Sequence, residues 1–351
     1  MTQSIYLAIS GLGLIGRRHA QAIARQPGIE LVGVADPAEA GQVEAHRLGV
    51  PCYDSLPEMI EATRPEGVII ATPTSQHAAQ ALTCIDRALP VLIEKPIATS
   101  VAEGQRVVDA AEARGVPVLV GHHRRYNPLI EKAHEVITSG ILGEVRAVQA
   151  TCWFYKPDAY FEEAPWRKQK GAGPISVNLV HDVDLLRHLC GEVISVRAMA
   201  APSRRGSENE DVAAALLTFE SGALGTLTVS DAIAAPWSWE MTARENAVYP
   251  ATAESCYLIG GSRGALSLPD LRVWSHTGKA PDWWLPISAT HLAQEAADPL
   301  VRQIAHFGAV IRDGVAPRVS AREGMRTLVV IEAIQRSAET GDAVQLSTGA
   351  A

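Results

Sequence analysis

The chain has 351 residues, of which 47% are hydrophobic and 20% charged, and its formal net charge is -8 at pH 7. This length suits two domains of ordinary size, each with its own core. The acidic balance argues against a nucleic-acid-binding surface and against binding to an anionic membrane, so we expect a small-molecule partner, no nucleic acid and no membrane.

The spacing of the cysteines and the N-terminal residues indicate in which cellular compartment the protein is expected. The five cysteines show no CxxC spacing, and MTQSIYLAISGLG lacks the basic region and long apolar run of a secretion signal. No run of about 20 apolar residues occurs that could span a membrane. We therefore expect a cytoplasmic protein with reduced thiols.

Short β-branched runs alternate with helical stretches in the first part of the chain. The runs are IYLAIS, ELVGVAD, GVIIAT, VLIEKP and VPVLVGH, and the segments between them are long enough for crossover helices. This alternation is typical of a doubly wound parallel sheet. We predict an α/β protein whose N-terminal Rossmann domain covers residues 1–122.

The pattern changes in residues 123–351, where all seven tryptophans lie. A helix expected around 128–139 precedes strand-like runs in EVRAVQATCWFY, VISVRAMAA, VAAALLTFE, LGTLTVSDA and CYLIGG. Too few helices separate these runs for further βαβ units, so we predict a C-terminal α/β domain with a large, mostly antiparallel open sheet covered on one face. Helices are expected near 296–312 and 321–338, before a last strand in AVQL. We expect the C-terminal helix to pack back on the Rossmann domain.

A GxGxxG sequence, Gly11-Leu12-Gly13-Leu14-Ile15-Gly16, follows the first predicted strand and precedes a helix. In such a turn the first glycine permits the tight bend, the second lets the backbone approach a pyrophosphate, and the third lets the helix pack on the sheet. The pyrophosphate would bind at the helix N-terminus, against the backbone of Gly13, Leu14 and Ile15.

Asp36 closes the second predicted strand. Its carboxylate can accept hydrogen bonds from the ribose hydroxyls of a dinucleotide and would repel a 2′-phosphate. Because the following Pro37, Ala38 and Glu39 supply no arginine, NAD is predicted in preference to NADP. A simple strand-end turn is the alternative interpretation of Asp36.

Two further strands end in unusual polar segments, ATPTSQH with Thr72, Pro73 and His77, and LIEKP with Glu94 and Lys95. Carboxyl ends of strands line the ligand site of an open α/β sheet, so we expect these five residues to face the cofactor. A lysine there is costly to desolvate unless an anion or ligand compensates it. Lys95 is therefore a candidate functional amine, with a solvated surface charge as the alternative.

Taken together, GLGLIGRRH, IIATPTSQH, EKP, GHHRRYNP, the stretch from WRKQKGAGP to HDVD, and DPLVRQIAHFGAVIRDG resemble the Gfo/Idh/MocA family of oxidoreductases, named for glucose-fructose oxidoreductase and inositol dehydrogenase. The resemblance implies a Rossmann domain, a second α/β domain whose open sheet often forms oligomer contacts, and a substrate bound between the domains. It also implies that Lys95 holds and polarises the reacting hydroxyl and that His181 accepts its proton. We expect a homodimer or homotetramer.

One position departs from the family pattern. Many members carry an aspartate four residues before the histidine, whereas this chain has Val177 there, followed by Asn178. On a helix Asn178 lies at i-3 from His181, so it can point in the same direction, and its amide can donate as well as accept a hydrogen bond. We expect a substrate different from that of the inositol enzymes rather than loss of the reaction.

His181 allows three interpretations. As a catalyst it would take the hydroxyl proton during hydride transfer, for which histidine titrates in a useful range. As a metal ligand it would share a helical face with Asp184 and His188, but neither HExxH nor a second His/Cys cluster supports a metal site. As a spectator it would be a core histidine. The context favours the catalyst, no metal is expected, and Asp182 is a candidate to orient the imidazole or contact the substrate.

Further candidate substrate residues are His123, Arg124, Tyr126 and Trp153. Solvated arginines at a helix entrance are an equally good interpretation of Arg124 and Arg125. Aromatic faces suit the C–H faces of a sugar or cyclic polyol, although most such residues simply pack a sheet. The basic residues Arg124, Arg167, Lys168 and Lys170 could instead hold a carboxylate.

We therefore predict an NAD(P)-dependent dehydrogenase that oxidises a secondary alcohol of a cyclic polyol, sugar or sugar acid. Three alternatives stay open. They are a dehydrogenase of a carboxylated cyclic cis-diol, an NAD-dependent glycosidase that oxidises its substrate transiently, and a nucleotide-binding regulator that is not an enzyme.

Overall fold

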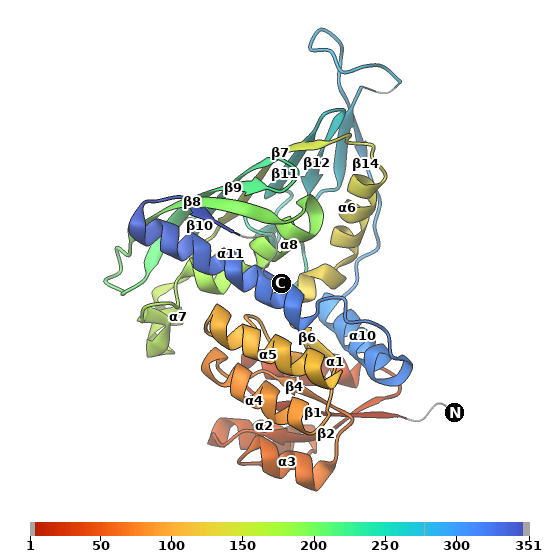
Figure 1. The fold of residues 1–351 in the computed structure, drawn as a ribbon, viewed down its shortest axis with the longest axis vertical. Helices are drawn as coiled ribbons and strands as arrows, with labels where there is room; N and C mark the ends of the chain where they lie inside the picture. Colours follow the sequence, from red (N-terminus) through yellow and green to blue (C-terminus); the bar gives the residue numbers. More distant parts are fainter. Residues whose placement is uncertain (1–3, 277, 347–351) are drawn as a thin grey trace. The chain divides into compact units, whose positions relative to one another are not determined.

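The computed structural model describes residues 4–276 and 278–346 (Figure 1). The chain divides into two compact units, Met1–Tyr126 with Asp298–Leu328, and Asn127–Ala297 with Val329–Ala351. The division thus falls after Tyr126 rather than after residue 122, and a C-terminal segment returns to the first unit.

The first unit contains a six-stranded sheet in the order β3-β2-β1-β4-β5-β6, and all of its paired strands are parallel. Its strands are β1 (Ile5–Ser10), β2 (Ile29–Ala35), β3 (Cys52–Tyr53), β4 (Gly67–Ile70), β5 (Val91–Ile93) and β6 (Val118–Val120), and its crossover helices are α1 (Leu14–Ala24), α2 (Glu39–Leu48), α3 (Leu56–Thr63), α4 (Thr74–Asp86) and α5 (Val101–Arg114). The strand order reverses between β1 and β4, the point at which doubly wound sheets bind ligands. The predicted Rossmann fold is confirmed, although the short strand β3 was not predicted.

Local sequence signals set the ends of the crossover helices. The Ser100 hydroxyl accepts a hydrogen bond from the backbone N–H of Glu103 at the start of α5, and Ser55 caps α3 in the same way through Glu58. Gly115, with φ 64°, ends α5 in the left-handed conformation that glycine adopts without strain.

Helix α10 (Pro299–Asp313) belongs to the core of the first unit. Asp298 caps it by accepting a hydrogen bond from the backbone N–H of Leu300. Its apolar face contributes Leu300, Ile304, Phe307 and Val310 to the cluster that also holds Ile5, Ile9 and Ile29 of the parallel sheet. The division between the units then passes through α11 (Ala321–Thr340).

The second unit is built on a nine-stranded sheet in the order β14-β13-β12-β11-β7-β10-β9-β8-β15. Its strands are β7 (Val145–Trp153), β8 (Val193–Pro202), β9 (Glu210–Phe219), β10 (Leu224–Ser230), β11 (Tyr257–Gly261), β12 (Gly264–Leu268), β13 (Arg272–Ser275), β14 (Ser288–His291) and β15 (Val344–Gln345). Only the β7–β10 pair is parallel among the pairs of the described residues. The predicted mostly antiparallel sheet is confirmed, but β12, β13 and β14 were not predicted.

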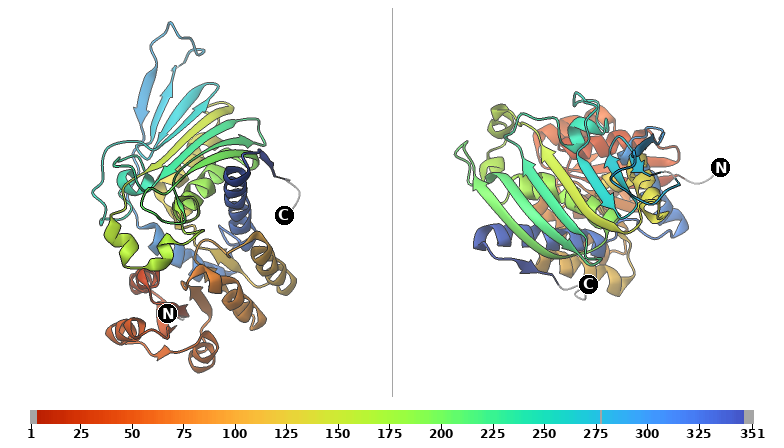
Figure 2. Two further views of the ribbon diagram at one scale, coloured as in Figure 1. Left: turned by 90° about the vertical axis from the view of Figure 1, so that its left-hand side faces the viewer. Right: turned by 90° about the horizontal axis from the view of Figure 1, so that it is seen from above.

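One face of this sheet is covered by helices (Figure 2). The covering elements include α6 (Pro128–Thr138), α8 (Val180–Cys190) and the part of α11 after Val329, whose side chains join those of the sheet in one buried cluster. On the opposite face the strand register aligns Leu216 of β9, Thr226 of β10, Gln149 of β7 and Leu258 of β11 in one exposed row. The face of the sheet opposite these helices, which we call the bare face, therefore carries exposed apolar side chains.

The structure bears on the expectations of reduced thiols and of no membrane-spanning segment. All five cysteines are free thiols, and burial raises the pKa of Cys84 and of Cys190 to about 12. Among the described residues, no helix combines the length and the apolar character needed to cross a membrane.

Candidate active site

The turn between β1 and α1 combines three glycines with different surroundings. Gly11 has φ 89°, and a Cβ on it would lie 2.7 Å from the carbonyl oxygen of Ala71. A Cβ on Gly16 would lie only 2.0 Å from the Gly11 oxygen, so glycine is required for α1 to meet the turn. A Cβ on Gly13 would meet no described atom within 4 Å. Gly13 therefore leaves an open cradle at the start of α1, where a pyrophosphate fits.

The neighbouring positions complete this cradle. Leu14 and Ile15 form the first turn of α1, and Leu14 is 82% exposed. Asp36 directly follows β2, and its two carboxylate oxygens accept hydrogen bonds from the backbone N–H groups of Leu12 (2.7 Å) and Ala38 (2.9 Å). Each carboxylate oxygen has a second lone pair, so Asp36 can still accept hydrogen bonds from ribose hydroxyls.

His77 joins the loops that follow β4 and β5. Its Nε2 lies 2.9 Å from the carbonyl oxygen of Thr72, and its Nδ1 lies 2.8 Å from that of Pro96. Burial lowers the pKa of His77 below its usual value, which favours the neutral ring. The side chain is buried, and Pro73 forms the N-cap of α4 beside it. His77 therefore contacts the backbone of both loops, and its neutral ring donates to only one of the two carbonyl oxygens at a time.

Glu94 precedes Lys95 at the end of β5 and is buried against α1. The Nε2 atom of His19 lies 2.7 Å from Glu94 Oε1, and the backbone N–H of Lys95 donates to Glu94 Oε2 at 3.2 Å. Burial by itself would raise the pKa of Glu94, but the hydrogen bond and charge of His19 lower it to about 2. An ionised carboxylate only accepts hydrogen bonds, so His19 donates through Nε2. This buried pair fixes the loop that carries Lys95.

The segment after β6 forms a short 3₁₀ helix, His123–Tyr126, whose residues are all buried. Arg125 forms an ion pair with Glu323 at 3.3 Å, and the Tyr126 ring packs between His306 and the Arg318 guanidinium. The expectation of solvated arginines is therefore wrong, because this segment is held inside the first unit. His123 lies close enough to Glu94 to help lower the pKa of that carboxyl group.

In the second unit, His181 follows an unusual helical turn. Residues Ile175–Leu179 form a π-helix, and α8 continues from Val180, so Asn178 and His181 do not lie on a plain α-helix as predicted. Ile175 donates its backbone N–H to Glu210 Oε1 at 2.9 Å, and a Cβ on Gly173 would lie 2.4 Å from the same oxygen. Burial raises the pKa of Glu210. Single π-helical turns are frequent at functional sites.

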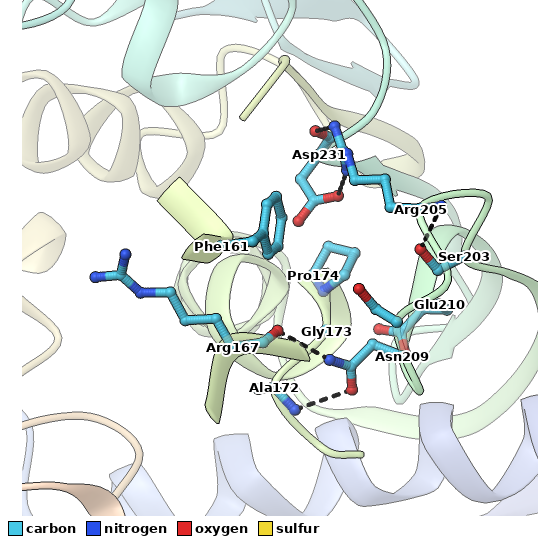
Figure 3. A pocket seen from close by; sticks show the side chains of 11 residues that line it. Phe161, Arg167, Ala172, Gly173, Pro174, Ser203, Arg205, Asn209, Glu210 and Asp231 are labelled. Atoms are coloured by element: carbon cyan, nitrogen blue, oxygen red, sulfur yellow. Dashed lines mark hydrogen bonds and ion pairs between the residues drawn. The ribbon is translucent and has the colours of Figure 1, made fainter. Parts of the chain in front are cut away.

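Asn178 contacts a lysine that was not predicted. Lys156, which follows β7, donates from Nζ to Asn178 Oδ1 at 2.7 Å, and both residues are buried. Lys156 Nζ also lies 3.3 Å from Asp231 Oδ2, and Asp231 is shared with Arg205 (Figure 3). The cavity drawn there has a volume of about 10 Å³, which accommodates about one water molecule rather than a substrate.

The other predicted residues of this unit are engaged within it. Asp182 is fully buried and accepts a hydrogen bond from the Tyr257 hydroxyl of β11. The rings of Trp153 and Trp237 meet edge to face with their centroids 5.9 Å apart. His188 stacks on His134 at 4.6 Å. Within residues 4–276 and 278–346, no group of three or more His, Cys, Asp or Glu side chains could hold a metal ion.

Sequence reasoning missed His19, Lys156 and Glu210. The buried positions Gly16, His19, Ala20 and Ile23 of α1 follow i, i+3, i+4, i+7 spacing, so His19 could have been recognised as an inward polar side chain that needs a partner. Lys156 and Glu210 carry no comparable signal, because their partners are distant in the sequence.

The parallel sheet with its strand-order reversal, the open cradle at Gly13 and the carboxylate at the end of β2 define a dinucleotide-binding α/β protein. Residues 5–122 match a family model described as "Oxidoreductase family, NAD-binding Rossmann fold", and residues 130–267 match the GFO/IDH/MocA C-terminal domain. The chain therefore belongs to the Gfo/Idh/MocA family, as an NAD-binding oxidoreductase. The predicted family, enzyme class and cofactor are confirmed.

Individual relatives agree with this assignment. The chain is 32% identical over 186 residues to the rhizopine catabolism protein MocA of Rhizobium meliloti, a match that covers 53% of this chain and 57% of that protein. It is 27% identical over 349 residues to D-apiose dehydrogenase of Paraburkholderia graminis, covering 97% of this chain and 89% of that one. The crystal structure of WlbA dehydrogenase from Bordetella pertussis in complex with NADH and UDP-GlcNAcA superimposes with a TM-score of 0.80 at 26% identity, over 98% of this chain and 99% of that chain.

Proposed function

We propose that the protein is an NAD-dependent dehydrogenase that oxidises a secondary alcohol of a cyclic polyol, sugar or sugar acid. When bound, NAD supplies the hydride acceptor. Lys95 holds the reacting hydroxyl and stabilises negative charge as it develops on the oxygen, and His181 accepts the hydroxyl proton. The glycine turn would hold the pyrophosphate, and Asp36 the adenosine ribose.

The observation that carries this proposal lies within the first unit. Lys95 directly follows β5, and Gly13 and Asp36 follow β1 and β2, so all three stand at the carboxyl edge of one parallel sheet. The buried Glu94–His19 pair holds the backbone of the loop that carries Lys95. A lysine at the edge that carries the dinucleotide site favours chemistry, because a nucleotide sensor needs only the dinucleotide site. The names of the relatives, which include a sugar dehydrogenase, support the substrate class.

The proposal is tested by following absorbance at 340 nm with NAD, and separately with NADP, across inositols, aldoses, sugar acids and cyclic cis-diol carboxylates. We expect NADH to accumulate with at least one compound. Release of a sugar without accumulation of NADH would favour the transient-oxidation glycosidase. NAD binding without turnover of any compound would favour the regulator.

Asp36→Ser should weaken the preference for NAD over NADP. Serine removes the negative charge that repels a 2′-phosphate. It also removes one of the two carboxylate oxygens that accept hydrogen bonds from the backbone N–H groups of Leu12 and Ala38. A hydrogen bond to a charged group contributes roughly 1.5–3 kcal/mol, so the NAD-to-NADP ratio of dissociation constants should change by about 10- to 100-fold. Calorimetry with both nucleotides measures it. Asp54→Ser, at an exposed position after β3, is the control, and an unchanged ratio in Asp36→Ser would refute the ribose assignment.

We also propose that the bare face of the nine-stranded sheet binds a second copy of the chain. Met199 and Leu216 on this face are 78% and 57% exposed, and Leu224 and Leu258 lie on the same face. Contiguous exposed apolar side chains of this kind mark association surfaces. We expect light scattering to give the mass of a dimer or tetramer for the native chain and of a monomer for Leu216→Glu. Val43→Glu, on α2 of the first unit, should leave the mass unchanged; a monomeric native protein would contradict the proposal.

A further inference from the structure

Helix α2 packs directly against the side chain of Asp36 at Gly41. Gly41 is buried, and a Cβ on it would lie 2.3 Å from Asp36 Cγ, 2.6 Å from Oδ2 and 2.7 Å from Cβ. The optimal separation of two non-bonded carbon atoms is about 3.5–4.0 Å. The side chain of Asp36 therefore fills the space that any side chain at position 41 would need.

A rotation of the Asp36 side chain would not make room for a methyl group at position 41. Its Cβ does not move when χ1 changes, so the 2.7 Å contact would remain. Rotation would also break the hydrogen bonds that the carboxylate accepts from the backbone N–H groups of Leu12 at 2.7 Å and Ala38 at 2.9 Å. The backbone of Asp36 is held as well, because its N–H donates to the Tyr53 carbonyl oxygen at 2.9 Å. A larger residue at position 41 must therefore displace α2 or the carboxylate.

Helix α2 itself gives no reason for a glycine at this position. Glycine inside a helix is destabilising relative to alanine, because glycine loses more conformational freedom on folding. Gly41 is not among the glycines of the described residues that have a positive φ, so its backbone conformation is open to alanine as well. Its N–H donates to the carbonyl oxygen of Ala38 at 2.9 Å, which any residue other than proline could do. The requirement for glycine comes from the space that Asp36 occupies.

We infer that Gly41 is a positioning residue for the selection of the cofactor. It lets α2 pack against Asp36 and so keeps the carboxylate in place after β2, where the remaining lone pairs of its oxygens can accept hydrogen bonds from the ribose hydroxyls. The negative charge that repels a 2′-phosphate is fixed in the same way. Gly41 acts through Asp36 and needs no contact with NAD. This inference rests on the proposed function, because it takes Asp36 as the residue that binds the ribose.

Gly41→Ala tests the inference through the ratio of the dissociation constants of NAD and NADP, measured by calorimetry. We expect the preference for NAD to fall by about 10- to 100-fold, because a displaced carboxylate loses its hydrogen bonds to the ribose. A general loosening of the first unit would weaken both nucleotides alike and leave the ratio unchanged. Gly104→Ala on α5 is the matched control. Its Cβ would lie nearest to the flexible side chain of Met325, at 3.3 Å, and this variant should keep the native ratio.

The Asp36→Gly background separates the contact with Asp36 from other effects of the methyl group. Asp36→Gly removes all three atoms nearest to the added Cβ, so Gly41→Ala in this background should change the dissociation constant of NAD by no more than about twofold. A native ratio in Gly41→Ala, with a changed ratio in Asp36→Gly, would overturn the inference alone. An equal loss of NAD affinity on adding Gly41→Ala in both backgrounds would also overturn it. An unchanged ratio in Asp36→Gly would instead refute the ribose assignment of the proposed function, and the inference with it.

Folding of each variant is measured by circular dichroism during urea unfolding. If Gly41→Ala does not fold, we expect Asp36→Gly to restore folding in the double variant, because it removes the side chain that the methyl group meets. A double variant that is equally unfolded would show that Gly41 is needed for another reason, and it would overturn the inference.

Discussion

His181→Ala should lower kcat by about 10²- to 10⁴-fold while leaving the dissociation constant of NAD within about twofold of the native value. General-base catalysis by a positioned side chain contributes an effect of this size. NAD affinity should persist because the Gly13 cradle and Asp36 belong to the first unit, whereas His181 belongs to the second. Steady-state kinetics at 340 nm and calorimetry with NAD measure the two quantities.

His291→Ala provides the matched control for this experiment. His291 lies on β14 of the same unit and is exposed at the edge of the sheet. The His291→Ala variant should retain the native kcat. A His181→Ala enzyme within about tenfold of native activity would remove His181 from the proposed chemistry, and an equal loss of activity and NAD affinity would indicate a structural role.

The second large effect concerns the buried His19–Glu94 pair. His19→Ala should lower the free energy of unfolding by about 3–5 kcal/mol at pH 7, because it leaves the buried Glu94 carboxylate without its principal partner. Urea unfolding is followed by circular dichroism at 222 nm, which reports the helices of both units, and by tryptophan fluorescence, which reports the second unit because all seven tryptophans belong to it. The loss should appear in the circular dichroism transition. His46→Ala, on the exposed side of α2, should change the free energy by no more than about 0.5 kcal/mol.

The pH dependence of this loss has a definite sign. In the native protein the pKa of Glu94 is about 2, below its ordinary 4.5, so its contribution to stability is present above about pH 4.5 and is lost as the pH falls toward 2. Without His19, burial raises the pKa of Glu94, and the variant binds this proton more readily when folded. The difference in stability between native protein and variant should therefore shrink between pH 7 and pH 4. A constant difference would contradict the pairing, and Glu94→Gln in the His19→Ala background should recover part of the loss.

The alternation of strands and helices predicted the first unit well because crossover connections leave a long, regular signal. Long strands such as β7 and β9 were equally visible. Strands β12, β13 and β14 were not, because they are short and lie toward one side of the sheet, where β14 is exposed along its whole length. Their existence depends on pairing with neighbouring strands, which local composition does not encode.

Some parts of the candidate site could be predicted from the sequence, and others could not. The glycine turn and Asp36 could be found because a dinucleotide cradle is local in sequence. The Glu94–His19 bond joins residues 75 positions apart, and the Lys156–Asn178 bond joins residues 22 apart, so only the folded chain reveals them. The π-helical turn before His181 likewise escaped prediction, because Ile175 bonds to the side chain of Glu210 on another element.

Net hydride transfer to NAD is tested most directly with a substrate deuterated at its carbinol carbon. The compound that gives NADH in the 340 nm survey is used in that form, and nicotinamide C4 is examined by NMR after complete turnover. We expect one deuterium in the reduced nicotinamide for each molecule of ketone formed. Deuterium returned to a sugar product, with no NADH accumulating, would contradict a dehydrogenase and identify transient oxidation instead.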